Sequence, residues 1–254
     1  MNAPRDDRKR GSRWLTPPRS PRLSADEVHV WRASLMRSEE EMGTLLRSLS
    51  EDELLRAYRF HFPRDRARFI AARGILREIL GRYTRTPPEC VRFGYNAYGK
   101  PELLDAEERE RLRFNLSHAG RVALFAVASG REVGVDVETL RDDLACAELA
   151  AEFFSRGEVE ALTALPARAR TRAFFNCWTR KEAYIKARGM GLSLPLDCFD
   201  VSLAPGEPAA LLATRGGEPE ATRWSLHEID VGTNHVAALA VEDGCRRLNR
   251  WLWP

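Results

Sequence analysis

Hydrophobic residues recur along the chain with the period of a helix in some stretches and alternate with the period of a strand in others. Apolar residues between positions 69 and 80 follow helical spacing, with Gly81 as the expected end of that helix. Ser50 and Glu53 form the sequence pattern of a capping box, so another helix is expected to begin after Ser50. Strands are predicted at residues 28–35 and 91–93, and a polar loop at residues 96–102.

The second half of the chain is predicted to open with three strands, at residues 114–118, 122–129 and 132–138. Two helices should follow, at about residues 148–165 and 170–187, the second ended by Gly189 and Gly191. Further strands are expected around residues 199–203, 222–229 and 235–241. Because strands and helices are mixed without the regular alternation of a doubly wound sheet, the predicted fold class is α+β.

A shift of 105 residues without a gap aligns the two halves of the chain weakly. It places Ser50 on Ser155 and Glu53 on Glu158, so the same capping pattern occurs twice. This predicts two halves related by a pseudo-twofold axis, with a cleft between them, and such clefts are preferred ligand sites. The expected organisation is a disordered basic leader at residues 1–25, an N-terminal half at 26–130 and a C-terminal half at 131–254.

Composition excludes several classes of protein. The 254 residues are 44% hydrophobic and 30% charged, as in ordinary globular proteins. The longest apolar run, residues 122–128, is far shorter than the roughly 20 residues that span a bilayer. The charged N-terminus lacks the apolar segment of a secretory signal, so a cytoplasmic protein is expected. Five cysteines without a C-x-x-C pair predict free thiols rather than disulfides or a zinc site.

Basic residues are distributed unevenly in sequence and in type. Residues 1–22 hold seven Arg or Lys and two Asp, so the rest of the chain is slightly acidic, and no specific nucleic-acid partner is expected. Of the 40 basic residues only four are lysines: Lys9, Lys100, Lys181 and Lys186. Lysine is a compact point charge and a possible proton donor, whereas arginine is effectively never deprotonated. The three lysines beyond the leader are therefore candidate functional residues, unless chance and a genome rich in G and C explain the bias.

Two segments bring carboxylates together. Asp136 and Glu138 are two residues apart on a predicted strand, so both project from one face, and Gly134 before them permits close backbone approach. Glu182 and Lys186 lie four residues apart on a predicted helix and share a face with Trp178. Either pair taken alone is usually a solvated surface feature.

Two further segments could bind an anion. Ser117 and His118 end a predicted strand, and no nucleophile-elbow pattern surrounds the serine. Lys100 lies in a rigid Gly-Lys-Pro turn, which suits a phosphate. Three carboxylates, two lysines and a Ser-His pair together describe a reaction on a phosphorylated substrate assisted by Mg²⁺.

The segments YGKPEL, FNLSHAGR, GVDVE and WTRKEAYIKARGMGLSLPL, in this order and spacing, resemble the motifs of the Sfp-type 4′-phosphopantetheinyl transferases. The resemblance spans about Ser50 to Val201. It implies two pseudo-repeated α+β halves with coenzyme A in the cleft. It also implies transfer of the phosphopantetheine arm to a serine of an apo acyl or peptidyl carrier protein, with release of adenosine 3′,5′-bisphosphate. The two-half length implies a monomer of the branch that serves polyketide, nonribosomal peptide and antibiotic biosynthesis.

The resemblance also implies a role for each matching residue. Asp136, Glu138 and Glu182 would hold Mg²⁺, with Mn²⁺ as the alternative metal, against the pyrophosphate, and Glu182 would take the serine proton. Lys186 would neutralise the pyrophosphate. The 3′-phosphate and nucleotide side would be bound by Lys100, Ser117, His118, Arg56 and Arg68. Trp178 and Lys181 complete the helical motif, Trp178 as packing. Glu53 stands where some members carry a basic residue, and Ala119 replaces a polar residue.

Two alternatives from other classes remain. A strand with two acids, together with an acid and a lysine on a helix, can also serve a metal-dependent nuclease. The basic leader would then bind DNA, although the acidic body argues against this interpretation. The second alternative is a module that binds coenzyme A or a carrier protein without catalysis. The presence of all three acids argues against this alternative.

Overall fold

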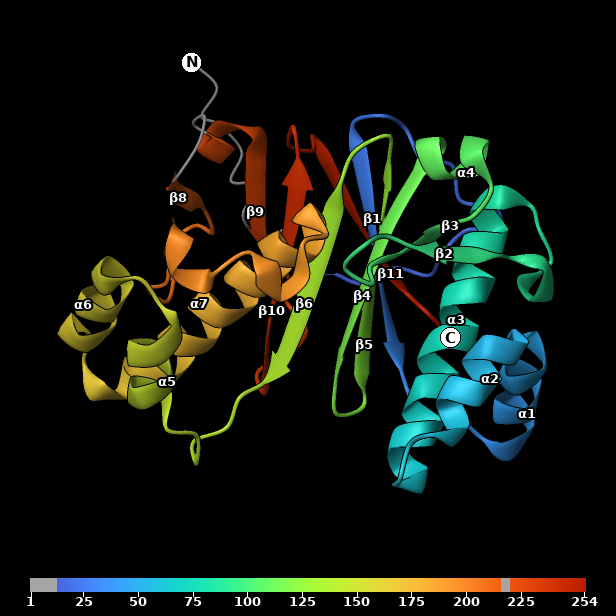
Figure 1. The fold of residues 1–254 in the computed structure, drawn as a ribbon, viewed down its shortest axis with the longest axis horizontal. Coiled ribbons are helices and arrows are strands. Elements are labelled where there is room, and N and C mark those ends of the chain that lie inside the picture. The colour runs from blue at the N-terminus through green and yellow to red at the C-terminus, as the bar shows by residue number, and fades with distance from the viewer. Residues whose placement is uncertain (1–12, 216–219) are drawn as a thin grey trace, which may run out of the picture.

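The computed structural model describes residues 13–215 and 220–254, and it confirms the predicted mixture of helices and sheets (Figure 1). Two sheets pack face to face in the centre of the molecule, and helices cover the outer side of each sheet (Figure 1). The four-stranded sheet has the order β11-β1-β5-β4, and the three-stranded sheet has the order β6-β10-β9. Two hairpins, β2-β3 and β7-β8, complete the strands of the described residues.

The first sheet is built mainly from the N-terminal part of the chain. Its strands are β1 (Glu27–Ser34), β4 (Leu112–Ala119), β5 (Val122–Ser129) and β11 (Arg247–Leu252). Its outer side is covered by α1 (Glu39–Ser48), α2 (Glu51–Tyr58) and the long α3 (Pro63–Thr84) (Figure 1). Trp31 of β1 and Ile75 of α3 are fully buried in the core between these layers. The hairpin β2 (Phe93–Tyr95) and β3 (Pro101–Leu103) and the short α4 (Ala106–Arg111) follow α3.

The second sheet belongs to the C-terminal part. Its strands are β6 (Val133–Thr139), β9 (Trp224–Glu228) and β10 (His235–Glu242). Against it pack α7 (Ala167–Arg188) and, further out, α5 (Cys146–Phe153) and α6 (Arg156–Ala164) (Figure 1). The hairpin β7 (Phe199–Val201) and β8 (Leu211–Thr214) follows α7 in the sequence and packs beside the helix. Short 3₁₀ turns occur at Pro88–Cys90, Gly191–Ser193, Leu196–Cys198 and Glu220–Arg223.

The sheets meet through an apolar layer and through one polar seam. Val135 and Val137 of β6 face the apolar layer, as the alternation of that strand predicts. At the seam, β4 and β6 share no ladder of backbone hydrogen bonds among the described residues. Instead the Val135 amide donates to Asn115 Oδ1 at 2.9 Å, and the Val137 amide donates to Ser117 Oγ at 3.4 Å. Side chains of β4 therefore satisfy the open edge of β6.

The capping pattern found twice in the sequence forms twice in the structure. Ser50 and Glu53 make a capping box on α2, and Ser155 and Glu158 make one on α6. Both glutamates are buried and bind cations on the long helix of their half, Glu53 with Arg73 and Arg77 and Glu158 with Lys181. Helices α3 and α7 each contain 22 residues. The twofold relation of the halves and the boundary between them stay predictions.

Several predicted boundaries differ from the structure. The helix expected to end at Gly81 continues to Thr84, since Arg85 adopts the left-handed conformation that ends it. The strand expected at residues 91–93 forms at Phe93–Tyr95. One predicted helix at 148–165 is two, α5 and α6, because Ser155 caps the second. Strand β11, within the predicted second half, pairs with β1 in parallel.

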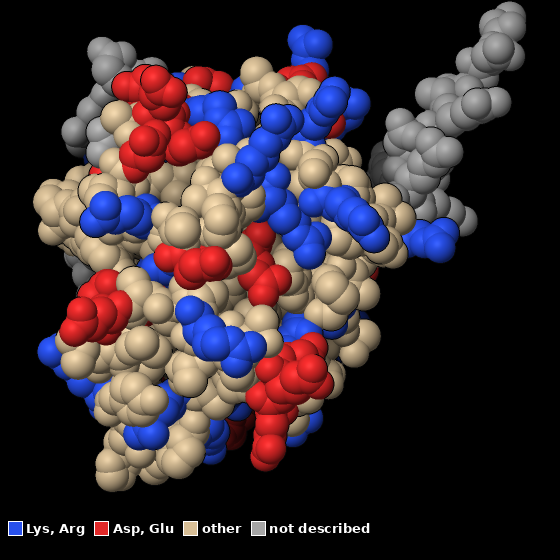
Figure 2. Space-filling view, turned by 90° about the vertical axis from the view of Figure 1, so that its right-hand side faces the viewer, with Lys and Arg blue, Asp and Glu red and all other residues tan. Residues whose placement is uncertain are grey.

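The structure describes only part of the predicted leader. The predicted disorder of residues 1–12 lies outside the described residues, whereas Leu15 exchanges backbone hydrogen bonds with Arg250 and Leu252. In the described part of the chain, no helix is long and apolar enough to span a bilayer. On the side that carries α3, acidic and basic side chains are interspersed rather than gathered in patches of one sign (Figure 2).

The contact between β6 and α7 depends on Gly134. A Cβ at this position would lie 2.1 Å from Ala183 O and 2.3 Å from the Ala187 amide nitrogen, both in the backbone of α7. We expect Gly134→Ala to lower the free energy of unfolding by about 1–3 kcal/mol or more, since the helix must move. Urea unfolding measures this, with Gly157→Ala as the control, because a Cβ at Gly157 meets no atom within 4 Å. Equal stability of the two variants would contradict the close contact.

Candidate active site

The centre of the site is an ion pair between β6 and α7. Lys186 Nζ lies 2.6 Å from Asp136 Oδ1, and it also donates to Ser117 Oγ at 3.1 Å. Ser117 Oγ donates in turn to Asp136 Oδ1 at 2.9 Å. Asp136 is almost completely buried, whereas the Lys186 side chain is 29% exposed. The structure thus brings together three of the predicted site residues from three different elements.

One oxygen of Asp136 has no hydrogen-bond partner among the described residues. This oxygen, Oδ2, is buried, although an ionised carboxylate oxygen in the interior ordinarily accepts hydrogen bonds. A buried carboxylate oxygen without a donor is well suited to bind a cation. The sequence predicts Asp136 as a site residue, and the structure shows that Oδ2 is the oxygen without a hydrogen-bond donor among the described residues.

The two other predicted acids belong to the same electrostatic group. Burial, followed by the negative charge of Asp136, raises the pKa of Glu138 to about 6. The same two causes raise the pKa of Glu182, and the positive charge of Lys186 opposes the shift in both residues. Within the described ranges, no three acidic, histidine or cysteine side chains converge closely enough to form an assembled metal cluster. Even so, three carboxylates with one open buried oxygen fit Mg²⁺, which prefers oxygen ligands and retains water.

His118 and Arg68 lie at the edge of this group. His118 is exposed at the end of β4, and desolvation by the surrounding protein lowers its pKa, as do the nearby charges of Lys186 and Arg68. Arg68, in the first turns of α3, also contacts Asp65 at 3.3 Å. Arg56 lies on α2, with its guanidinium 5.4 Å from the centre of the Phe69 ring. The roles of these three residues in nucleotide binding stay predictions.

Lys100 points to a different place from the acids. Its ammonium lies 2.7 Å from Glu132 Oε2 and 2.9 Å from Ala187 O, so it connects the β2-β3 hairpin to β6 and α7. Burial lowers the pKa of Lys100, and Glu132 opposes this effect. The contact of Lys100 with a 3′-phosphate stays a prediction. The present hydrogen bonds of the ammonium do not favour it, because they go to protein groups.

A pocket of about 280 Å³ opens beside Glu182 and Lys186. Its walls are largely apolar, with Tyr98 of the hairpin loop, Leu116 of β4 and Ile185 of α7 among the lining residues. Sequence reasoning missed Tyr98 and the two asparagines Asn96 and Asn115, which join the halves near this pocket. Tyr98 and Asn115 lie inside the motif segments YGKPEL and FNLSHAGR, and Asn96 lies just before the first, but no local pattern separates these residues from their neighbours.

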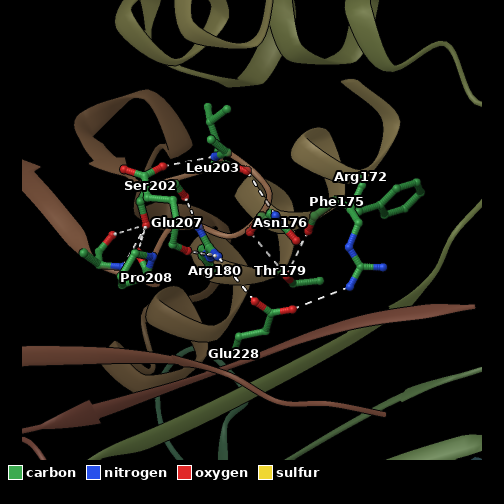
Figure 3. Close-up of polar contacts among 12 residues, drawn as sticks. Arg172, Phe175, Asn176, Thr179, Arg180, Ser202, Leu203, Glu207, Pro208 and Glu228 are labelled. Carbon is green, nitrogen blue, oxygen red and sulfur yellow. Dashed lines mark hydrogen bonds and ion pairs between the residues drawn. The ribbon is translucent and has the colours of Figure 1, made fainter. Parts of the chain in front are cut away.

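The remaining polar residues of the α7 motif are structural. Lys181 is fully buried and donates to Leu196 O and Phe199 O besides its ion pair with Glu158. On another side of the helix, Arg180 donates to Ser202 O at 2.7 Å, next to Glu228 (Figure 3). Trp178 packs on Phe174, which confirms its prediction as a packing residue. These contacts fix the rotation of α7, so that Glu182 and Lys186 face the site.

Comparison with known proteins decides the family. The model described as 4′-phosphopantetheinyl transferase superfamily matches residues 132–240, and the model 4′-phosphopantetheinyl transferase, N-terminal, matches residues 31–130. The 4′-phosphopantetheinyl transferase HetI of Nostoc sp. is 44% identical over 228 residues, which cover 90% of this chain and 93% of HetI. The chain belongs to the 4′-phosphopantetheinyl transferase family.

This transferase is similar to further members of the family. The 4′-phosphopantetheinyl transferase Sfp of Bacillus subtilis is 32% identical over 166 residues, 65% of this chain and 71% of Sfp. The 4′-phosphopantetheinyl transferase psf-1 of Bacillus pumilus is 34% identical over 204 residues, 76% of this chain and 84% of psf-1. The protein is thus a transferase enzyme, as the four sequence motifs predict.

The raised pKa of Glu138 gives a test of the acidic group in this transferase. An unfolded glutamate ionises near pH 4.5, whereas Glu138 in the folded protein ionises near pH 6, so its ionisation lowers stability as the pH rises through this interval. Without added divalent metal, we expect Glu138→Gln to raise the free energy of unfolding at pH 7.5. The expected gain is about 1 kcal/mol, because partial exposure screens the charges.

Urea unfolding at pH 4.5 and pH 7.5 measures this effect. The gain should disappear at the lower pH, where Glu138 is largely protonated. Glu152→Gln, at an exposed position of α5, is the control and should show no such pH dependence. A Glu138→Gln variant that is less stable than the parent at pH 7.5 would contradict the arrangement of the three acids.

Proposed function

We propose that the enzyme transfers the 4′-phosphopantetheine arm of coenzyme A to a serine of an apo acyl or peptidyl carrier protein. Adenosine 3′,5′-bisphosphate is the other product, and Mg²⁺ is the metal, with Mn²⁺ as a possible substitute. The observation that carries this proposal is the buried Asp136, whose Oδ2 is open while Oδ1 binds Lys186. A carboxylate in this state can hold a cation beside an ammonium, and both can face a pyrophosphate.

Asp136, Glu138 and Glu182 are the residues that would hold the metal. The ion, when bound, supplies positive charge to the pyrophosphate oxygens as the bond to the leaving group breaks. In the protein without metal, burial and the negative charge of Asp136 raise the pKa of Glu138 and Glu182, so holding these carboxylates together costs free energy. Lys186 offsets part of this cost, and a bound cation would offset more of it.

Lys186 and Glu182 carry the remaining steps. The carrier serine oxygen forms a bond to the phosphorus of the pantetheine phosphate, and the bond from that phosphorus to the bridging oxygen breaks. Adenosine 3′,5′-bisphosphate leaves with the electron pair, and the partly exposed Lys186 ammonium neutralises its growing charge. Glu182, which lines the pocket beside Lys186, accepts the serine proton. Positioning and charge neutralisation suffice for such phosphoryl transfer.

The class of carrier protein, the oligomeric state and the cellular location are further parts of the proposal. We propose that the carriers belong to polyketide or nonribosomal peptide biosynthesis, and that the enzyme acts as a monomer in the cytoplasm. The presence of both halves in one chain supports this assignment, since each half matches its own family model.

Mass spectrometry of intact carrier proteins tests the reaction. Several apo carriers incubated with the enzyme, coenzyme A and Mg²⁺ should each gain one phosphopantetheine arm, and EDTA should prevent the gain. Asp136→Ala and Glu182→Gln should lower turnover on the order of a hundredfold or more, since each removes a group that acts on the reacting atoms. Exposed Glu152→Gln serves as the control.

Three results would change the assignment. Near-native turnover of Asp136→Ala would contradict the metal site. Binding of coenzyme A without transfer to any carrier would favour the inactive binding module. Metal-dependent cleavage of plasmid DNA, unaffected by coenzyme A, would favour the nuclease.

A further inference from the structure

The loop between β2 and β3 lies against the end of α7. Asn96 Nδ2 donates to Gly189 O at 2.8 Å, and Lys100 Nζ donates to Ala187 O at 2.9 Å. Carbonyl groups in the last turn of a helix have no partner within the helix. Here two of them receive donors from a distant hairpin, and the Lys100 charge stands at the negative end of the helix dipole.

The loop is held in a fixed shape by the same asparagine. Asn96 Oδ1 accepts hydrogen bonds from the amides of Tyr98 and Lys100, both at 2.9 Å. The backbone amide of Asn96 also donates to Lys100 O at 3.0 Å. One oxygen therefore organises the turn, while the nitrogen of the same side chain caps α7.

The fit between loop and helix end leaves little free space. Gly189 ends α7 with a φ of +64°, the left-handed conformation that favours glycine. A Cβ there would lie 2.9 Å from Asn96 Nδ2 and 3.1 Å from Lys100 Cδ. The helix end and the loop are thus in direct contact.

The donors of Lys100 are all used within the protein. An ammonium has three donors, and three acceptors surround this one: Glu132 Oε2 at 2.7 Å, Ala187 O at 2.9 Å and Val133 O at 3.4 Å. The Lys100 side chain is only 13% exposed. Glu132 and Val133 lie at the start of β6, so Lys100 contacts both elements that carry the acids.

We propose that Asn96 and Lys100 act as a clamp that positions the end of α7, and with it Lys186, against β6 for phosphopantetheine transfer. Lys186 directly precedes Ala187, whose carbonyl the clamp holds. Fraying of this turn would move the Lys186 ammonium away from Asp136, which it now contacts at 2.6 Å. Asn96 and Lys100 are positioning residues that act through α7. The link to catalysis rests on the proposed function, whereas the contacts themselves do not.

Two variants and a matched control separate the clamp from phosphate binding. Asn96→Asp keeps the oxygen that organises the turn and removes the donor to Gly189 O. Lys100→Met removes the ammonium. Arg113→Met is the control, because Arg113 Nε binds the other oxygen of Glu132 at 2.7 Å while the clamp contacts to α7 stay in place.

Kinetics with coenzyme A and with 3′-dephospho-coenzyme A test the catalytic part. We expect Asn96→Asp and Lys100→Met to lower kcat about ten- to a hundredfold, by the same factor with both substrates, since misplaced groups slow the chemical step. KM should change little, and Arg113→Met should remain within about twofold of the parent. A rise in KM confined to Lys100→Met and to the substrate with a 3′-phosphate would overturn the proposal in favour of phosphate binding.

Amide hydrogen exchange tests the clamp without any substrate. Amides of residues 186–190 should exchange faster in Asn96→Asp and Lys100→Met than in the parent and in Arg113→Met. Unchanged exchange in both clamp variants would refute the clamp. If the parent showed no transfer, the proposed function would fail while this measurement still decided the clamp. Thermal unfolding confirms that each variant is folded, and Lys100→Arg, which keeps a charged donor, should recover part of the protection.

Discussion

The close backbone contact between β6 and α7 at Gly134 is the constraint on which the site depends. Because this position lacks a Cβ, the helix lies directly on the strand, within reach of a lysine side chain. Lys186 then contacts Asp136, while burial and the negative charge of Asp136 raise the pKa of Glu138 and Glu182. A helix further away would leave Asp136 and Glu138 on β6 without the counter-charge of Lys186.

The polar residues of α7 divide into two groups with different physical roles. Arg180 and Lys181 are buried, and their hydrogen bonds to loop carbonyls fix the helix against the β7-β8 region. Glu182 and Lys186, on the remaining face, are partly exposed and carry the chemistry. A charged motif in a helix is therefore not evidence for catalysis at every position, since a buried cation with enough carbonyl partners stabilises the fold instead.

Much of the site follows from the sequence because its spacing rules are local. Two residues along a strand, or four along a helix, place side chains on one face, and this predicts the pairs Asp136 with Glu138 and Glu182 with Lys186. The contacts of Asn96 and Lys100 with α7 span about 90 residues, and no local pattern encodes them. Strand β11 was missed for the same reason, since its polar sequence becomes a strand only beside β1.

The parallel pairing of β11 with β1 has a consequence for how the protein folds. Residues at the two ends of the chain lie side by side, with Asn249 contacting Glu27 across 222 positions of sequence. On the ribosome, the first sheet lacks this edge strand until residues 247–252 have emerged, so the sheet is completed only after all strands of the second sheet have been made. Strand β1 can pair with β5 before then, but it gains its parallel neighbour only at that stage, beside the apolar layer between the two sheets. The order in which the strands are synthesised therefore differs from the order in which they lie in the sheet.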